Sequence, residues 1–158
     1  MKLEAVIEDI ETQGFFQSQP VPALEQQVQA KAVEITLQKS DLSLHLTAPL
    51  LGRNFISGFS ANTNKFQWVI VPLTQVERID TIHLANTFLE TEVGIRDLVE
   101  QHLIEKSIKV YGSDLKPIAG KVCRLKSGLI ELFANGDVFW VPIASISMIA
   151  VENFSDLN

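Results

Sequence analysis

Hydrophobic and polar residues alternate along several short stretches of the chain, and a period of two predicts half-buried strands. The stretches 42–46 and 108–111 both follow this pattern. Two other stretches, 66–71 and 138–141, are apolar at nearly every position. A strand of that kind needs cover on both faces. We therefore expect these two stretches to lie at a contact between parts of the chain or between two chains.

The stretch 71–79 returns in a second version at 141–149. In each version an apolar run ends at a proline, Pro72 or Pro142, and apolar residues then follow at steps of three. Proline has no N–H to donate to a sheet, so it ends the first strand and favours a 3₁₀-like turn before the next one. The sequence therefore predicts an internal repeat of strand, tight turn and strand.

Three stretches have the spacing of an amphipathic helix, in which apolar residues recur every three or four positions. They are 2–12, 22–37 and 92–103. Each of the first two precedes the first predicted strand, and the third precedes the strand at 108–111. The order of a helix followed by strands thus also repeats.

Glycines and turn residues refine the strand predictions. Gly58 and Gly120 each interrupt an apolar strand, where a missing side chain permits a sharp bend. Asn135 and Gly136 separate two apolar runs, which predicts a two-residue type I′ hairpin. Fewer residues separate Gly58 from Pro72 than separate Gly120 from the second proline, so we expect the hairpin of the first copy to be shortened.

Composition and charge narrow the class of protein. The 158 residues are 46% hydrophobic and 20% charged, as in globular proteins, and no run approaches the roughly 18 apolar residues of a membrane helix. Acidic residues stand near the N-terminus where a signal peptide would be apolar, so we expect a cytoplasmic protein without a membrane partner. The lone Cys123 suits a small core residue.

The order of elements resembles that of Sm-like and SH3-like small β-barrels. It is most similar to a group of uncharacterised actinobacterial proteins with an N-terminal helical segment and two barrels carrying a VPL-A-V turn. The matching positions are Val71-Pro72-Leu73 with Val76, and Val141-Pro142-Ile143 with Ile146. The RNA-binding signatures of Sm proteins are not found at these positions, so RNA binding is not implied by matching residues.

The resemblance implies a mainly β protein with some helix, an α+β fold. We expect two tandem Sm-like or SH3-like barrels, each preceded by a helix, plus an N-terminal helix. The expected divisions are a helical segment at 1–39, a first barrel with a shortened hairpin at 40–82, a linker helix and second barrel at 83–151, and a tail at 152–158.

The sequence contains no recognisable catalytic, metal or cofactor motif. His45, His83 and His102 are not spaced as a pair of metal ligands, and no serine stands in a nucleophile elbow. The glycines in the strand region stand singly, without the pattern of a phosphate-binding loop. We therefore expect a non-enzymatic protein without metal or cofactor.

The net charge of −6 disfavours a dedicated nucleic-acid binder, but the stretch 106–126 holds six basic residues against one acidic residue, a local charge of +5. These basic residues and one aromatic form a candidate contact for nucleic acid or a partner: Lys106, Lys109, Tyr111, Lys116, Lys121, Arg124 and Lys126. A second candidate set, for contact between repeats or chains, comes from the doubly apolar strands: Phe66, Trp68, Ile70, Val138, Phe139 and Trp140.

Two functions follow from these sets. The first is a protein-interaction or assembly module, monomeric or homodimeric, whose partner is a protein. The alternative is an Sm-like RNA-binding regulator that uses the basic stretch at 106–126. Opposing charge over the rest of the molecule favours the first.

Overall fold

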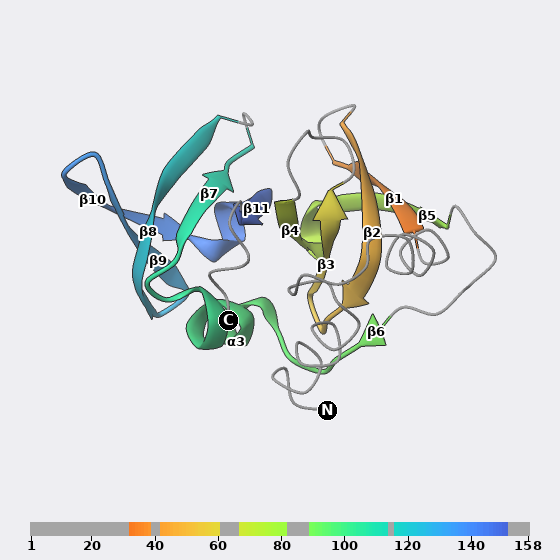
Figure 1. Cartoon of the computed structure of the whole chain (residues 1–158), viewed down its shortest axis with the longest axis horizontal. Helices are drawn as coiled ribbons and strands as arrows, with labels where there is room; N and C mark the ends of the chain where they lie inside the picture. Colours follow the sequence, from red (N-terminus) through yellow and green to blue (C-terminus); the bar gives the residue numbers. More distant parts are fainter. Residues whose placement is uncertain (1–31, 39–41, 61–66, 82–88, 114–115, 152–158) are drawn as a thin grey trace, which may run out of the picture.

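The computed structural model describes residues 32–38, 42–60, 67–81, 89–113 and 116–151 (Figure 1). The strands are β1 (Ala32–Leu37), β2 (Ser43–Leu51), β3 (Phe55–Ser60), β4 (Gln67–Pro72), β5 (Val76–Thr81), β6 (Leu89–Glu90), β7 (Ser107–Tyr111), β8 (Pro117–Lys126), β9 (Leu129–Ala134), β10 (Asp137–Pro142) and β11 (Met148–Val151). The helical turns are η1 (Leu73–Gln75), α3 (Ile95–Leu98), η2 (Val99–Leu103) and η3 (Ile143–Ser145).

All of these strands belong to one 11-stranded sheet with the order β10-β9-β8-β7-β11-β4-β3-β2-β1-β5, and the short β6 pairs with β2. We call β1 to β5 the first repeat and β7 to β11 the second repeat. Each repeat has the same internal order, in which its first strand lies between its second and its fifth. The repeats join where β11 pairs antiparallel with β4, so they lie side by side in Figure 1.

The expected pair of closed barrels is wrong, because the sheet is open. A barrel closes only when its outermost strands pair with each other. Here β4 pairs with β11 of the other repeat instead, and β10 and β5 remain as the two edges of the sheet. Alternation of apolar residues reports which face of a strand is buried, but it does not report which strand lies beside it.

The expected helix at 22–37 is also wrong over its last part, since residues 32–37 form β1. Val33, Ile35 and Leu37 are buried at a spacing of two and β1 pairs on both sides, with β2 and β5. Pairing of β1 with a strand on each side stabilises the extended backbone more than the helical spacing of these apolar residues favours a helix. The expected helix at 2–12 and the remainder of the second lie outside the described residues.

The predicted turns after the two prolines are confirmed. Pro72 leads into η1 and Pro142 into η3, with φ of −59° and −64° at the two prolines. The predicted helix at 92–103 is confirmed as α3 continued by the π-helical turn η2, over residues 95–103. At its start, Asn54 Oδ1 accepts a hydrogen bond of 2.8 Å from the backbone N–H of Ile95.

The glycine correspondence between the repeats is wrong. Gly58 lies in β3, the third strand of its repeat, whereas Gly120 lies in β8, the second strand of the other. The first hairpin is not shortened in its strands either, because β3 and β4 have six residues each, as β9 and β10 do. In the structure β1 corresponds to β7 and β3 to β9.

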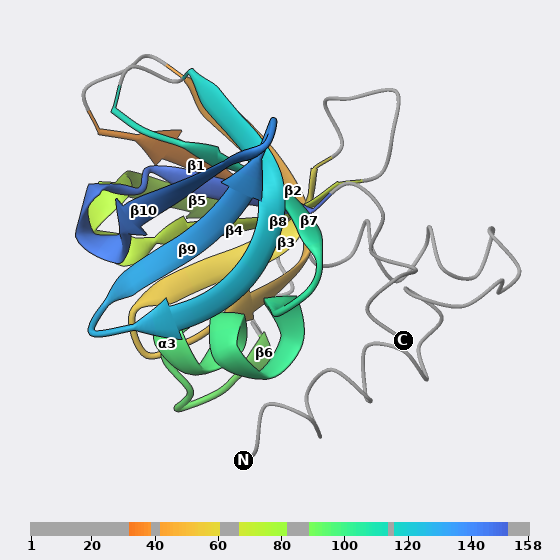
Figure 2. The same ribbon diagram turned by 90° about the vertical axis from the view of Figure 1, so that its left-hand side faces the viewer.

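The buried side chains form two clusters. One consists mainly of residues of the first repeat, among them Ile35, Leu46 and Val69, and also contains Met148 of β11. The other contains Trp68 and Ile70 of β4 together with Leu98 of α3 and residues of β7, β8, β9 and β11. The helix packs beneath the strands of the second repeat (Figure 2). Each cluster therefore contains side chains of both repeats, and the second cluster contains several from each.

The predicted type I′ turn is confirmed at Asn135 and Gly136, whose φ values are 54° and 84°. We expect Gly136→Val to destabilise the protein by about 1–2 kcal/mol, because a β-branched residue is strained at positive φ. Urea unfolding would measure this loss. Gly136→Asn is the matched control and should cost less, since asparagine tolerates this conformation. An unchanged midpoint for the valine variant would contradict the role of the turn.

Candidate functional site

The edge strand β10 exposes apolar side chains on both of its faces. Within the described part of the chain it pairs with β9 alone, so its other side offers unpaired backbone groups. The exposed fractions are 53% for Val138, 40% for Phe139 and 41% for Trp140, and Phe133 of β9 is 48% exposed. We call Phe133, Val138, Phe139 and Trp140 the β10 patch. Exposed apolar edge strands of this kind are sites of strand pairing.

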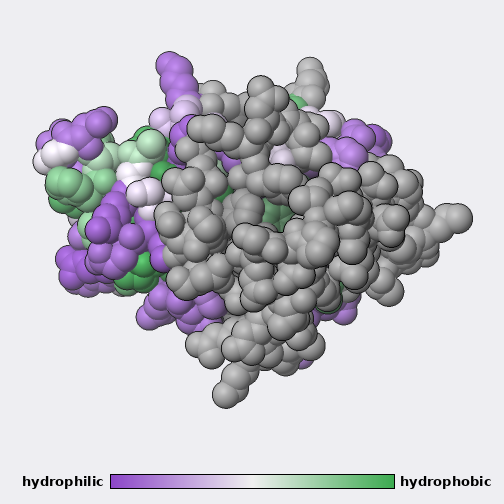
Figure 3. All heavy atoms as spheres, viewed as in Figure 1, coloured by the Kyte–Doolittle hydropathy of each residue, from purple (hydrophilic) through white to green (hydrophobic). Residues whose placement is uncertain are grey.

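The register shows how the patch is divided between the two faces. Val138 lies opposite Phe133, while Phe139 lies opposite Leu132, which is fully buried. Phe139 therefore lies on the core side of the sheet, and Val138 and Trp140 lie on the outer side, because neighbours in a strand point to opposite faces. In Figure 3 apolar surface appears at the left, where Figure 1 places β9 and β10.

Arg124 holds the outer side of the patch in place. Its guanidinium lies 5.2 Å from the centre of the Trp140 ring, and its Nε lies 3.0 Å from Glu131 Oε2. The three residues come from adjacent strands, β8, β9 and β10. The cation contacts the face of the indole, an arrangement that favours this orientation of the ring. The tryptophan is thus presented to solvent in a defined position.

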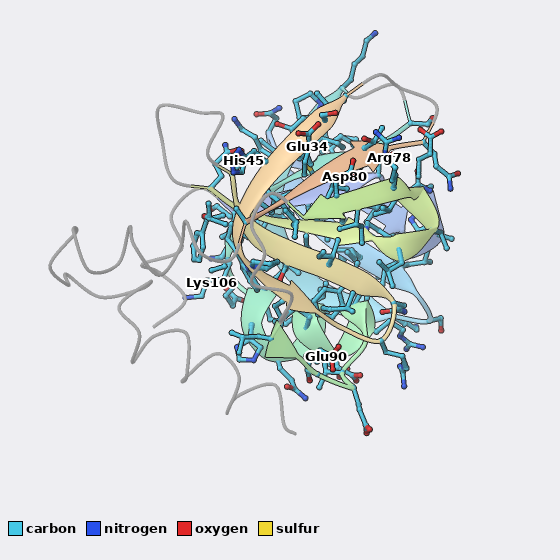
Figure 4. All side chains as sticks on the ribbon, turned by 90° about the vertical axis from the view of Figure 1, so that its right-hand side faces the viewer. Glu34, His45, Arg78, Asp80, Glu90 and Lys106 are labelled. Carbon is cyan, nitrogen blue, oxygen red and sulfur yellow. The ribbon has the colours of Figure 1, made fainter. Side chains whose placement is uncertain are left out.

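The opposite edge of the sheet has a different chemistry. β5 pairs with β1 alone within the described residues, and it carries the exposed Glu77, Arg78 and Asp80. Arg78 Nε lies 2.9 Å from Asp80 Oδ2. Figure 4 shows these two side chains near Glu34 of β1. Charged side chains on an edge strand discourage unspecific pairing, so the two edges of the sheet are not equivalent.

The structure brings only some of the basic candidates together. Lys109 and Lys121 line a hollow of about 350 Å³ along β7, β8 and β9, beside Phe133. Lys121 Nζ also lies 3.0 Å from Glu105 Oε2, so part of its charge is neutralised. Lys116 precedes β8 and Lys126 ends it, so the two lie ten positions apart, roughly 30 Å along the strand. The positive charge is therefore spread over the second repeat.

Two other candidates of this set, Tyr111 and Lys106, are half-buried. Tyr111, the aromatic residue of the candidate contact, packs against the cluster that contains Ile35 and Met148. Lys106 is half-buried just before β7, and its carbonyl accepts a 3.0 Å hydrogen bond from the N–H of Val122. Tyr111 therefore contributes to the packing between repeats.

The two doubly apolar strands have different surroundings. Trp68 and Ile70 lie in β4, which pairs with β11, and they are 2% and 0% exposed. They form part of the contact between repeats. Val138, Phe139 and Trp140 of β10 do not lie at the contact between the repeats. The expectation that they join the two repeats within one chain is therefore wrong. Contact of β10 with another chain stays a prediction, and Phe66 lies outside the described residues.

Sequence reasoning missed Phe133 and the role of Arg124. In β9 the buried Ile130 and Leu132 alternate with Glu131 and Phe133, so the period of two places Phe133 on the outer face. That signal was available in the sequence. The contact of Arg124 with Trp140 depends on the register of three strands, which the sequence does not give.

No family model matches the chain, and no curated protein matches it either. In the residues that the structure describes, no three His, Cys, Asp or Glu side chains gather closely enough to hold a metal ion. None of the helices in that part of the chain is long and apolar enough to cross a membrane.

Proposed function

We propose that the chain is a cytoplasmic, non-enzymatic protein-interaction module that binds a partner strand along the free edge of β10. The observation that carries this proposal is the exposed β10 patch on an edge strand. Added strands bind through main-chain hydrogen bonds, and side-chain pockets give specificity. β10 provides both elements, because its outer backbone groups have no neighbouring strand within the described residues and its apolar side chains project to both faces.

The contrast between the two edges supports the proposal. Burial of one large apolar side chain contributes about 1.5–3 kcal/mol, whereas an exposed ion pair contributes about 0–1 kcal/mol. The β10 patch has four such side chains within two strands, while β5 presents the Arg78–Asp80 pair. A partner therefore gains most by covering β10.

A retention experiment from native cells tests this proposal. The immobilised full chain is compared with the double variant Val138→Glu, Trp140→Glu. The matched control is Leu42→Glu, because Leu42 is also an exposed apolar residue but lies just before β2, which is far from β10 in the strand order. We expect the wild type and the control to retain the same proteins and the double variant to lose them. Equal retention by all three chains would contradict the proposal.

RNA binding is the second candidate function, and the hollow lined by Lys109, Lys121 and Phe133 is the observation in its favour. We expect no retention of RNA at physiological salt. The net charge is −6, and Lys121 and Arg124 each lie within 3.0 Å of a carboxylate. At physiological salt, electrostatic screening acts over about 8 Å, so the carboxylates beside Lys121 and Arg124 still repel phosphate.

Filter binding with labelled RNA measures the affinity of the chain for RNA. Sub-micromolar affinity that disappears in the double variant Lys121→Glu, Arg124→Glu would reverse the order of the two candidates. The matched control is Lys126→Glu at the far end of β8, which changes the charge outside the hollow.

A further inference from the structure

We infer that the partner of β10 is the β5 strand of a second copy of this chain, paired head to tail with the geometry that joins β11 to β4 within one chain. This inference rests on the proposed function, because it names the partner for the same edge. It follows from an equivalence between the free edges and the internal junction of the sheet.

The four strands concerned occupy equivalent positions in the two repeats. β4 and β10 are the fourth strands, and each ends in Val-Pro before a 3₁₀ turn. Aligned at these prolines, Trp68 corresponds to Val138 and Ile70 to Trp140. β5 and β11 are the fifth strands and follow those turns. Within one chain the fourth strand of the first repeat pairs with the fifth of the second.

Exposure at the equivalent positions supports the inference. Trp68 and Ile70 are 2% and 0% exposed, because β11 lies beside them and α3 belongs to the same cluster. Their counterparts Val138 and Trp140 are 53% and 41% exposed. Phe59, opposite Trp68, is 1% exposed, and its counterpart Phe133, opposite Val138, is 48% exposed.

The β10 patch is therefore the second repeat's version of a surface that the first repeat buries. In the first repeat a neighbouring repeat covers this surface. In the second repeat the described chain provides no such neighbour, and the missing strand is a fifth strand. Among the described strands, the fifth strand with a free side is β5, at the other end of the sheet. Because β10 and β5 lie at opposite ends of this open sheet, the β5 strand that we assign to β10 is that of another copy.

The internal junction also gives the register between chains. Ile149 lies opposite Ile70, and Ala150 lies opposite Val69. By the same alignment, Ile79 of one copy should lie opposite Trp140 of the next, and Asp80 opposite Phe139. Such an interface is heterologous, so each added copy leaves one edge free until a ring closes or a filament grows.

The contact between chains should be weaker than the internal junction. β11 presents the buried Met148 and Ala150 to its neighbours, whereas β5 presents the charged Arg78 and Asp80 at the same positions. Their mutual ion pair of 2.9 Å reduces the cost of covering them but does not remove it. We therefore expect an assembly that dissociates on dilution.

Sedimentation velocity of the full chain over a range of concentrations tests the assembly. We expect the average mass to rise with concentration, and Trp140→Asp to weaken association about thirty-fold or more, as loss of a central aromatic does at interfaces. Ile79→Asp should weaken it likewise. Trp140→Asp keeps an intact β5 and Ile79→Asp keeps an intact β10, so a mixture of the two variants should form a dimer that grows no further.

Disulfide cross-linking tests the register and does not depend on the stability of those variants. In a Cys123→Ser background, Phe139→Cys with Asp80→Cys should form oligomers linked between chains under oxidation. Phe139→Cys with Glu77→Cys, three residues out of register on the same strand, is the matched control and should remain unlinked. Equal cross-linking of both pairs would overturn the proposed register.

The remaining outcomes separate this inference from the proposed function. A chain that stays monomeric at all concentrations and forms no cross-link overturns the second copy as partner. If the Ile79→Asp variant by itself still self-associates, through pairing of two β10 strands, β5 is not the partner and the inference is overturned as well. If the monomeric chain still retains a cellular protein through β10, the proposed function stands with another partner. If it retains nothing, the proposed function fails too.

Discussion

Replacing Trp68 by alanine is expected to lower the free energy of unfolding by about 3–5 kcal/mol, the usual cost of removing a large aromatic side chain from a core. Trp68 is 2% exposed and belongs to the cluster that contains residues of both repeats. Its loss would leave a cavity where β4 meets β11. Urea unfolding followed by circular dichroism measures the change.

The matched control is Trp140→Ala in the second repeat. Trp140 is 41% exposed and its ring contacts Arg124, so its loss should cost about 1 kcal/mol or less in a dilute monomer. The loss of stability on replacing tryptophan by alanine should thus be large on the buried surface of the first repeat and small on its exposed counterpart in the second repeat. Similar losses for the two tryptophans would contradict the burial that the structure assigns to them.

The second large effect is expected at Leu98 of α3. This side chain is fully buried among residues of both repeats, so Leu98→Asp would place an unpaired carboxylate inside the apolar cluster. An uncompensated buried charge costs several kcal/mol, and a domain has only about 5–15 kcal/mol of stability to lose. We expect the variant to lose its cooperative thermal unfolding transition.

Gln101→Asp is the control for that variant. It introduces the same charge into the same helix, at an exposed position in η2. Its thermal midpoint should stay within a few degrees of the wild type, as for most surface substitutions. A cooperative transition in Leu98→Asp at the wild-type midpoint would show that α3 does not pack against the sheet as described.

Local signals in the sequence predicted local structure well. The prolines at 72 and 142 predicted the 3₁₀ turns, and Asn135-Gly136 predicted the hairpin, because proline and glycine restrict their own backbone angles directly. The helix at 95–103 also followed from its apolar spacing. Each of these features depends on residues within a few positions of one another.

The arrangement of strands depends on distant residues and could not be predicted in the same way. The stretches 66–71 and 138–141 have the same apolar pattern, yet β4 lies inside the sheet and β10 at its edge. Ile35 fitted a helical spacing until β2 and β5 paired on either side of it. For the same reason Trp140 could be identified as unusual from the sequence, but its exposure required the strand order.

Hydrogen exchange of the backbone amides of the full chain, measured at low and high protein concentration, tests most directly whether the β10 edge is an interface covered by β5. At low concentration the outward amides of β10 should exchange quickly, because none of the strands that the structure describes pairs with that side of β10. At high concentration we predict slower exchange in β10 and β5 together, with β4 and β11 unchanged. Rapid exchange in β10 at both concentrations would contradict the account.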